Sequence, residues 1–159
     1  MFTYGIVRCF LGNTSNGDHL RYFGIIKKNC FLMAVGGVVY GFIEILWRGK
    51  THWSMILTGG FCFAVLNAVY KKFADMLLVK KCLLGSAIIT SVEFLCGMIV
   101  NVKLKWNVWD YSHLRFNIKG QVCLLYSALW SLLCLPVCAV CKLMNRKGLP
   151  QTMLRQSFF

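Results

Sequence analysis

The sequence is poor in acidic residues and in proline. Of its 159 residues, five are Asp or Glu, two are Pro and 14% are charged. A soluble domain of this length needs more polar side chains to cover its surface, and a loop-rich chain needs more proline. The hydrophobic fraction of 58% also excludes intrinsic disorder. The class that remains is a small polytopic membrane protein.

Basic residues are in large excess, and two classes of partner could explain them. The 18 Lys and Arg residues give a formal net charge of +13. Such a charge suits a protein that binds nucleic acid, or segments that face an anionic membrane leaflet. The basic residues flank apolar runs and do not form one patch. We therefore expect the lipid bilayer as a partner, and no nucleic acid.

The nine cysteines do not indicate a disulfide framework, because most of them lie in apolar runs where a thiol packs as a small hydrophobic side chain. Cys134, Cys138 and Cys141 have the C-x3-C-x2-C spacing of an iron–sulfur cluster motif, but they lie in an apolar helix. The histidines match no compact zinc motif. We predict no metal and no cofactor.

Four apolar runs predict an all-α fold. Each is close to the ~20 residues with which a helix crosses a membrane, and a spanning segment must be helical to satisfy its backbone groups. We expect a four-transmembrane-helix bundle with helices at about 30–47, 53–70, 82–102 and 122–141. These belong to a membrane domain at 29–144. An interfacial or poorly ordered segment at 1–28 precedes it, and a basic tail at 145–159 follows it.

The connections and their charges predict how the chain lies in the membrane. Residues 48–52 leave room only for a short first hairpin. The segment between the third and fourth helices contains Trp106, Trp109, Tyr111 and Phe116, residue types typical of the membrane–water interface. Lys and Arg are more frequent on the side of the two termini and the 71–81 connection. The positive-inside rule then predicts a multi-pass protein of the cell membrane with both termini in the cytoplasm and the aromatic loop outside.

Two of the few acidic residues fall inside predicted membrane helices. Glu44 lies four residues before Arg48, so the two can form an ion pair on one helix face. Glu93 lies near the middle of the third helix, where a charged carboxylate costs ~2.5–3.5 kcal/mol. It must be protonated, paired or turned toward a polar cavity. Its spacing from Gly97 and Asn101 predicts a stripe that faces the bundle interior.

Small residues predict where helices approach one another closely. Gly37 and Gly41 form a Gly-x-x-x-Gly pair on the first helix, and Gly59 and Gly60 lie in the second.

The topology gathers polar residues near one membrane face, and two interpretations stay open. The cluster could line a pocket for a polar or ionic ligand, with Arg48 and His52 facing Glu44 and Asp110, or it could only hold the hairpin and the aromatic loop together. The candidate residues for a ligand or ion path are Glu44, Arg48, His52, Glu93, Asn101, Asp110, Tyr111, Asn117 and Gln121.

Two motifs of common enzymes are absent. The sequence has neither a G-x-x-x-x-G-K-[ST] phosphate-binding loop nor a G-x-S-x-G nucleophile elbow. We predict no catalytic residues and do not expect an enzyme.

Four spaced blocks of sequence are similar to a bacterial family of small integral membrane proteins. The blocks are Gly36-Gly37 with Tyr40 and Ile43–Gly49, then Thr51–Met55, then Ile89-Thr90 with Glu93-Phe94, Gly97 and Asn101, and finally Trp109–Ser112 with Phe116-Asn117 and Gly120-Gln121. They resemble the family described as putative ABC-transporter type IV, also called CmpB-like permease. Arg115 stands where that family leads us to expect proline, and Lys50 where it leads us to expect an apolar residue.

The resemblance implies a transporter permease whose ATPase would be a separate chain. In that case the basic connection offers a cytoplasmic docking surface with Lys71, Lys72, Lys80 and Lys81. A small fold also makes a homo-oligomer an expected partner. Three alternatives stay open: a proton-coupled exporter that uses Glu93, a membrane enzyme that uses Glu44, His52 and Asp110 at the outer face, and a structural or partner-binding membrane protein. The sequence does not identify the substrate, the direction of transport or the coupling ion.

Overall fold

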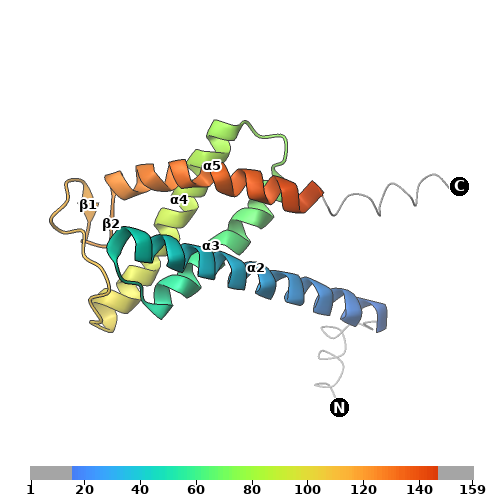
Figure 1. Ribbon diagram of the computed structural model, residues 1–159, viewed down its shortest axis with the longest axis horizontal. Coiled ribbons are helices and arrows are strands. Elements are labelled where there is room, and N and C mark those ends of the chain that lie inside the picture. Colours follow the sequence, from blue (N-terminus) through green and yellow to red (C-terminus); the bar gives the residue numbers. More distant parts are fainter. Residues whose placement is uncertain (1–15, 147–159) are drawn as a thin grey trace, which may run out of the picture.

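The computed structural model describes residues 16–146, which form a mainly helical bundle (Figure 1). Its elements are α2 (Asn16–Arg48), α3 (Trp53–Lys72), α4 (Leu78–Gly97), the π-helix η1 (Met98–Lys103), the strands β1 (Asn117–Ile118) and β2 (Val122–Cys123), and α5 (Leu124–Arg146). Four helical segments are long and apolar enough to cross a membrane, at Ile26–Arg48, Trp53–Lys72, Leu78–Lys103 and Leu124–Asn145. The predicted all-α, four-helix membrane fold is therefore confirmed.

The first helix starts earlier than the sequence predicted. α2 begins at Asn16, so the expected boundary near residue 28 falls inside a continuous helix. No proline interrupts residues 16–48, and a helix can continue through such a stretch even where Lys27 and Lys28 make it polar. At 1.5 Å per residue its 33 residues span roughly 50 Å, which exceeds the ~30 Å of a bilayer core. Residues 1–15, and 147–159 of the predicted basic tail, lie outside the described residues.

The last helix starts later than predicted, for a local reason. Val122 and Cys123 pair antiparallel with Asn117 and Ile118 and so form the second strand of a hairpin. The hairpin turns at Gly120, whose φ of +67° is strained for any residue with a side chain. The helix can begin only after this strand, at Leu124.

Glycines allow two of the helices, α2 and α3, to pack closely against each other. α2 packs mainly against α3, and α5 mainly against α4. A Cβ atom on Gly37 would lie 2.6 Å from the carbonyl oxygen of Ile56, and one on Gly60 would meet the backbone of Met33. Only glycine permits this approach, so the predicted close contact between the first two helices is confirmed.

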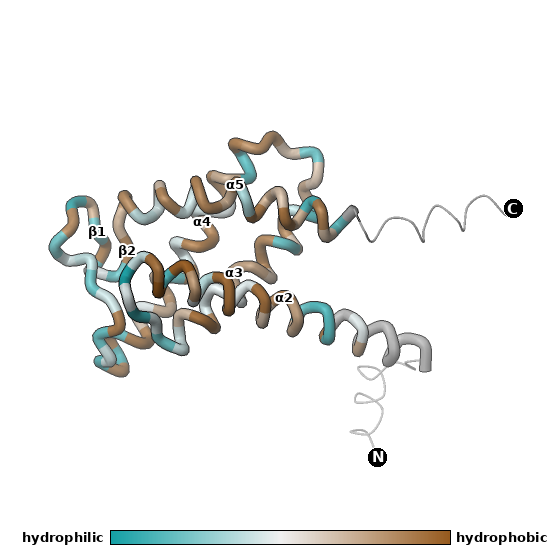
Figure 2. The backbone as a smooth tube through the Cα atoms, viewed as in Figure 1, coloured by the Kyte–Doolittle hydropathy of each residue, from teal (hydrophilic) through white to brown (hydrophobic). Residues whose placement is uncertain are grey.

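The connections occupy opposite ends of the bundle. The α2–α3 turn, η1 and the β-hairpin lie toward one end, while the α3–α4 turn and the end of α5 lie away from it (Figure 1). Hydrophobic residues run along the helices, and hydrophilic residues are more frequent near the helix ends and around the β-hairpin (Figure 2). Large apolar side chains such as Val38, Leu46 and Leu83 are exposed, as expected for surfaces that contact lipid tails.

Two buried clusters stabilise the bundle. One lies among α3, α4 and α5 and includes Leu66, Cys134 and Cys141. The other holds the aromatic loop on the bundle: Trp109 and Tyr111 are buried in it. The loop therefore inserts part of its aromatic residues into the protein. The eight cysteines of the described part carry free thiols, and most of them are buried, in agreement with a packing role.

Candidate functional site

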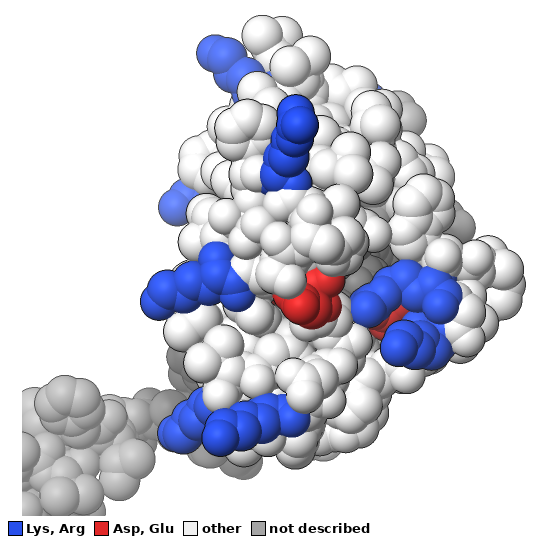
Figure 3. All heavy atoms as spheres, turned by 90° about the vertical axis from the view of Figure 1, so that its left-hand side faces the viewer, with Lys and Arg blue, Asp and Glu red and all other residues white. Residues whose placement is uncertain are grey.

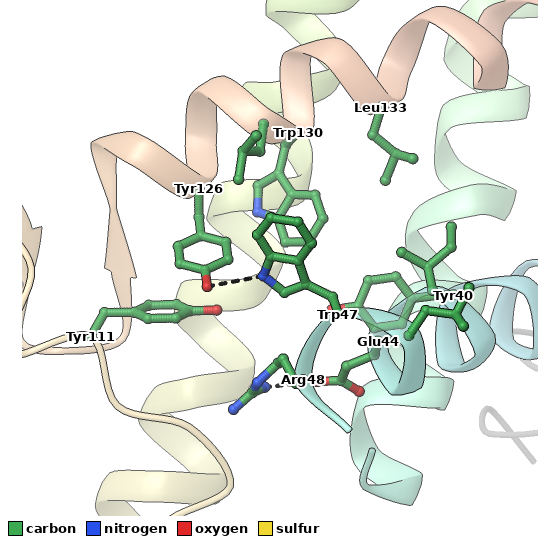
Figure 4. A pocket seen from close by; sticks show the side chains of 11 residues that line it. Tyr40, Glu44, Trp47, Arg48, Tyr111, Tyr126, Trp130 and Leu133 are labelled. Atoms are coloured by element: carbon green, nitrogen blue, oxygen red, sulfur yellow. Dashed lines mark hydrogen bonds and ion pairs between the residues drawn. The ribbon is translucent and has the colours of Figure 1, made fainter. Parts of the chain in front are cut away.

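A cavity opens between α2 and α5 on the side of the aromatic loop. Its volume is about 390 Å³, and its walls come from α2, α5 and Tyr111 of the loop. Figure 4 shows Trp47 extending from α2 toward Tyr126 and Trp130 on α5. The Trp47 indole N–H donates to the Tyr126 hydroxyl at 3.4 Å. We call this space the loop-side cavity.

The predicted ion pair forms at one wall of this cavity. The Arg48 guanidinium donates to Glu44 Oε1 at 2.8 Å and to the carbonyl oxygen of Val108 at 3.2 Å. The Thr51 hydroxyl donates to the other oxygen of Glu44. Glu44 is buried, and its carboxylate is satisfied by donors from its own helix and from the following turn. The pair therefore ties the end of α2 to the α2–α3 turn and to the loop.

Glu93 has a different environment, because its partners are neutral. Trp130 Nε1 donates to one carboxylate oxygen at 2.8 Å, and the Tyr111 hydroxyl donates to the other at 3.3 Å. Glu93 is 3% exposed. Among the side chains that the structure describes, the single salt bridge is that between Arg48 and Glu44, so Glu93 has no cationic partner among them.

A second cavity, of about 260 Å³, lies among all four long helices, and Glu93 lines it. We call it the central cavity. Tyr40, Ile43, Trp130 and Leu133 line both cavities, so the two spaces adjoin. Except for Glu93 and Thr58, the central cavity is lined mainly by apolar and aromatic side chains from α2, α3, α4 and α5.

Tyr111 connects the loop to Glu93. Its ring stacks on that of Tyr126, with centroids 4.5 Å apart. Burial raises the pKa of the Tyr111 phenol far above its ordinary value; the Glu93 carboxylate raises it further, and Arg48 opposes the shift. The phenol therefore keeps its proton near neutral pH and remains a donor to Glu93.

Asn101 and Gln121 hold the loop in place. The Asn101 amide donates to the carbonyl oxygen of Trp109 at 3.0 Å and to Gln121 Oε1 at 2.9 Å, and its own oxygen accepts from the Val108 N–H at 2.8 Å. Gly97 leaves room for Gln121 and Trp109 beside α4. Asn101 and Gln121 are buried and fully engaged, which is the arrangement expected of residues that stabilise the fold.

His52 and Asp110 do not join the Glu44–Arg48 pair. His52 caps α3, where its ring nitrogen accepts from the Ser54 N–H at 3.3 Å, and its ring packs on Trp53 and Trp106. Asp110 is exposed and accepts from the backbone N–H and hydroxyl of Ser112, which lower its pKa. The Arg48–Glu44 part of the predicted cluster is present. His52 and Asp110 do not join it, because Ser54 and Ser112 provide their hydrogen-bond partners.

Asn117 also has a local role. Its side-chain amide donates to the carbonyl oxygens of Ser112 and Leu114, and its oxygen accepts from the Gly120 N–H at 3.0 Å. These bonds shape the loop, and Asn117 lines neither of the two cavities. Figure 3 views this end of the molecule, where Lys and Arg side chains are spread around the face and acidic atoms show near its middle.

The candidate docking lysines lie at the other end of the bundle. Lys71 and Lys72 end α3, and Lys80 and Lys81 lie in the first turn of α4. Lys81 Nζ donates to the carbonyl oxygen of Ala74 at 2.6 Å and so helps to hold the turn, while the other three are exposed.

Sequence reasoning missed the aromatic walls of the cavities. Tyr40 and Trp47 lie within one turn of Glu44 on α2, and Tyr126 and Trp130 are four residues apart on α5. That spacing places each pair on one helix face, which was the available signal. It could not show that the two faces meet across a cavity.

A scan against protein-family models matches residues 22–156 to the family described as Putative ABC-transporter type IV. No curated protein and no solved structure matches the chain. The family model spans most of the sequence, including α3, α4, α5 and nearly all of α2, and it agrees with the resemblance found in the four sequence blocks. The chain therefore belongs to the putative ABC-transporter type IV family.

Proposed function

We propose that this chain is the membrane-spanning permease component of a transporter, and that the adjoining loop-side and central cavities form its substrate site. The observation that carries the proposal is the position of Glu93. A buried carboxylate without a cationic partner among the described residues lies in a membrane helix and lines a cavity. Ionisable groups within membrane helices typically mark substrate or ion pathways.

The alternative of a membrane enzyme has less support. It requires Glu44, His52 and Asp110 to act together, but His52 caps a helix and Asp110 binds its own loop. The alternative of a purely structural protein accounts for Asn101 and Gln121. It does not account for a cavity beside Glu93, since a carboxylate used only for packing needs no space next to it.

Coupling to ATP would require a partner, because this sequence contains no phosphate-binding loop. The exposed lysines at the α3–α4 turn, Lys71, Lys72 and Lys80, offer a basic docking surface for such an ATPase. In a tagged preparation, their replacement by serine should remove co-purifying ATP hydrolysis. Replacement of Lys103, Lys105 and Lys119 at the other end should retain it.

The orientation belongs to the same proposal. Docking of a cytoplasmic ATPase requires the α3–α4 turn, and with it both termini, to face the cytoplasm, as the distribution of Lys and Arg predicts. A reporter that fluoresces only in the cytoplasm, fused after Phe159, should be active. An inactive reporter would place the lysine surface on the wrong side and contradict the docking model.

Complementation tests the transport role. In a strain lacking the gene, the solutes of cells and medium are compared after expression of the wild type, Glu93→Gln or the charge-matched control Asp75→Asn. We expect the wild type and the control to restore the same solute distribution, and Glu93→Gln to fail although it reaches the membrane and unfolds at a similar temperature. Restoration by Glu93→Gln equal to the wild type would refute the proposed site.

A further inference from the structure

Aromatic rings form much of the wall of the loop-side cavity. Five of its lining residues are aromatic: Tyr40, Trp47, Tyr111, Tyr126 and Trp130. The ring centroids lie 4.5 Å apart for Tyr111 and Tyr126, 6.3 Å for Tyr126 and Trp130, and 6.1 Å for Tyr40 and Trp130. Figure 4 shows these rings on facing sides of the space between α2 and α5. The faces of Trp and Tyr rings attract cations, and more strongly where water is excluded.

The charges around the two cavities favour a positive ligand. From α2, Glu44 and Arg48 form a pair whose charges cancel. From α4, Glu93 adds a carboxylate that receives hydrogen bonds only from Trp130 of α5 and Tyr111 of the loop. α3 contributes no charged side chain to the lining. With Glu93 ionised, the lining carries one negative charge that nothing in it balances.

The charged side chains that line the two cavities also disfavour an anionic ligand. Arg48 is the one basic residue among those that line the two cavities. Its guanidinium already binds Glu44 and the carbonyl oxygen of Val108. An anion would have to break that pair and would lie near two carboxylates.

The central cavity supplies an apolar continuation. Its walls include Cys62, Phe63, Leu66 and Val137, and it adjoins the loop-side cavity through residues common to both. A ligand whose charge lies among the aromatic rings could therefore extend apolar groups into the bundle, where their burial would stabilise the complex.

We propose that the two cavities bind an organic ammonium or related onium cation that carries apolar groups. The aromatic rings contact the cation, Glu93 balances its charge, and the central cavity receives its apolar part. This inference names the ligand class of the site described under the proposed function and rests on that site being a substrate site.

The test uses two probes of matched shape and opposite charge. Tetraphenylphosphonium and tetraphenylborate are titrated separately into the purified full chain in lipid nanodiscs, with empty nanodiscs as the reference for partition into lipid. We expect saturable binding of the phosphonium, and at least tenfold weaker binding of the borate. Equal affinity for both ions, or no saturable binding of the phosphonium, would overturn the proposal.

Two sets of variants test the groups that make the site. Glu93→Gln should weaken phosphonium binding by about tenfold or more, and Asp75→Asn, which removes the same charge at the α3–α4 turn, should leave it within twofold. Tyr126→Leu should weaken binding by about five- to tenfold, whereas Tyr126→Phe, which keeps the ring face, should stay within threefold. The Tyr126 pair keeps the test decisive if Glu93→Gln fails to fold. Equal affinity of Tyr126→Leu and Tyr126→Phe would contradict a role for the ring.

The lipid composition of the nanodiscs distinguishes two possible sources of the natural cation, a free solute and a lipid headgroup. If the natural ligand is a free cation, phosphonium affinity should be equal in phosphatidylethanolamine and phosphatidylcholine nanodiscs. If it is the headgroup of a choline lipid, affinity should fall in phosphatidylcholine. Failure of all phosphonium binding, together with a transport phenotype that depends on Glu93, would reject the ligand class and retain the transport role. Binding without any transport phenotype would retain the site and reject that role.

Discussion

The two faces of α2 make opposite kinds of interface. Toward α3, Gly37 and Gly41 bring the helix against Ile56, and Gly60 of α3 lies against the backbone of Met33. Toward α5, the helix presents Tyr40, Glu44 and Trp47 to the loop-side cavity, and the central cavity adjoins that space among α2, α3, α4 and α5. On the α3 side, glycines let the two helix backbones approach closely. On the α5 side, large side chains keep the two helices farther apart.

The difference shows how a small bundle can combine stability with a site. In a membrane, helices associate through close packing and hydrogen bonds, because lipid tails already satisfy apolar surfaces. The α2–α3 interface meets that requirement along its glycines. The side of α2 that faces α5 is not closely packed in this way, and we propose that it binds the substrate.

Gly60→Leu should destabilise the protein most. Its side chain would enter the backbone of Met33 and force α2 and α3 apart, with an expected loss of about 3 kcal/mol in the free energy of unfolding. Unfolding in detergent, followed by tryptophan fluorescence, measures this loss. Gly24→Leu is the matched control, because no heavy atom lies within 4 Å of a Cβ placed there. Equal stability of the two variants would mean that the close interface does not govern folding.

Arg48→Met should have the next largest effect. It leaves the buried Glu44 carboxylate with the Thr51 hydroxyl as its remaining partner, at an expected cost of about 2 kcal/mol in unfolding free energy. The double variant Glu44→Gln with Arg48→Met removes both charges, and it should recover part of the loss in a double-mutant cycle. Additive losses would show that the two side chains do not interact.

Leu133→Trp tests the open face. Leu133 lines both cavities, so a larger side chain can occupy existing space, and the free energy of unfolding should change by about 0.5 kcal/mol or less. Complementation should nevertheless be lost, because the substrate site is filled. A destabilisation of about 1–3 kcal/mol would instead indicate that α2 and α5 close on each other in the bilayer.

The smallest effect concerns the aromatic loop. The hydrogen bonds from Ser112 lower the pKa of Asp110 below its ordinary value of 3.8. At pH values above 3.8, ionised Asp110 therefore stabilises the loop. This contribution should disappear as the pH falls through the lowered pKa. Hydrogen exchange at the Ser112 amide should accelerate over that range. Asp110→Asn should exchange faster at higher pH and lose this dependence, and an unchanged profile in that variant would exclude Asp110 as the source.

Local periodicity predicted much of the fold and part of the site. The Glu44–Arg48 pair depends on one turn of one helix, and the glycine pairs depend on the facing surfaces of a short hairpin, so both could be read along the chain. The separation of His52 and Asp110 from that pair could not be predicted from the sequence. It depends on local hydrogen bonds with Ser54 and Ser112, which form in place of contacts with Glu44 and Arg48.

Four membrane-spanning helices can be predicted from the amino-acid sequence alone, since length, hydropathy and the need to satisfy backbone groups leave few other structures. The sequence also indicates that Glu93 needs a special environment, because a carboxylate at that depth is costly. The nature of that environment follows from contacts between segments that are distant in the sequence. Trp130 and Tyr111 reach Glu93 from segments 37 and 18 residues away. Only the packing of α5 and the loop against α4 could place neutral donors, aromatic rings and open space around one carboxylate.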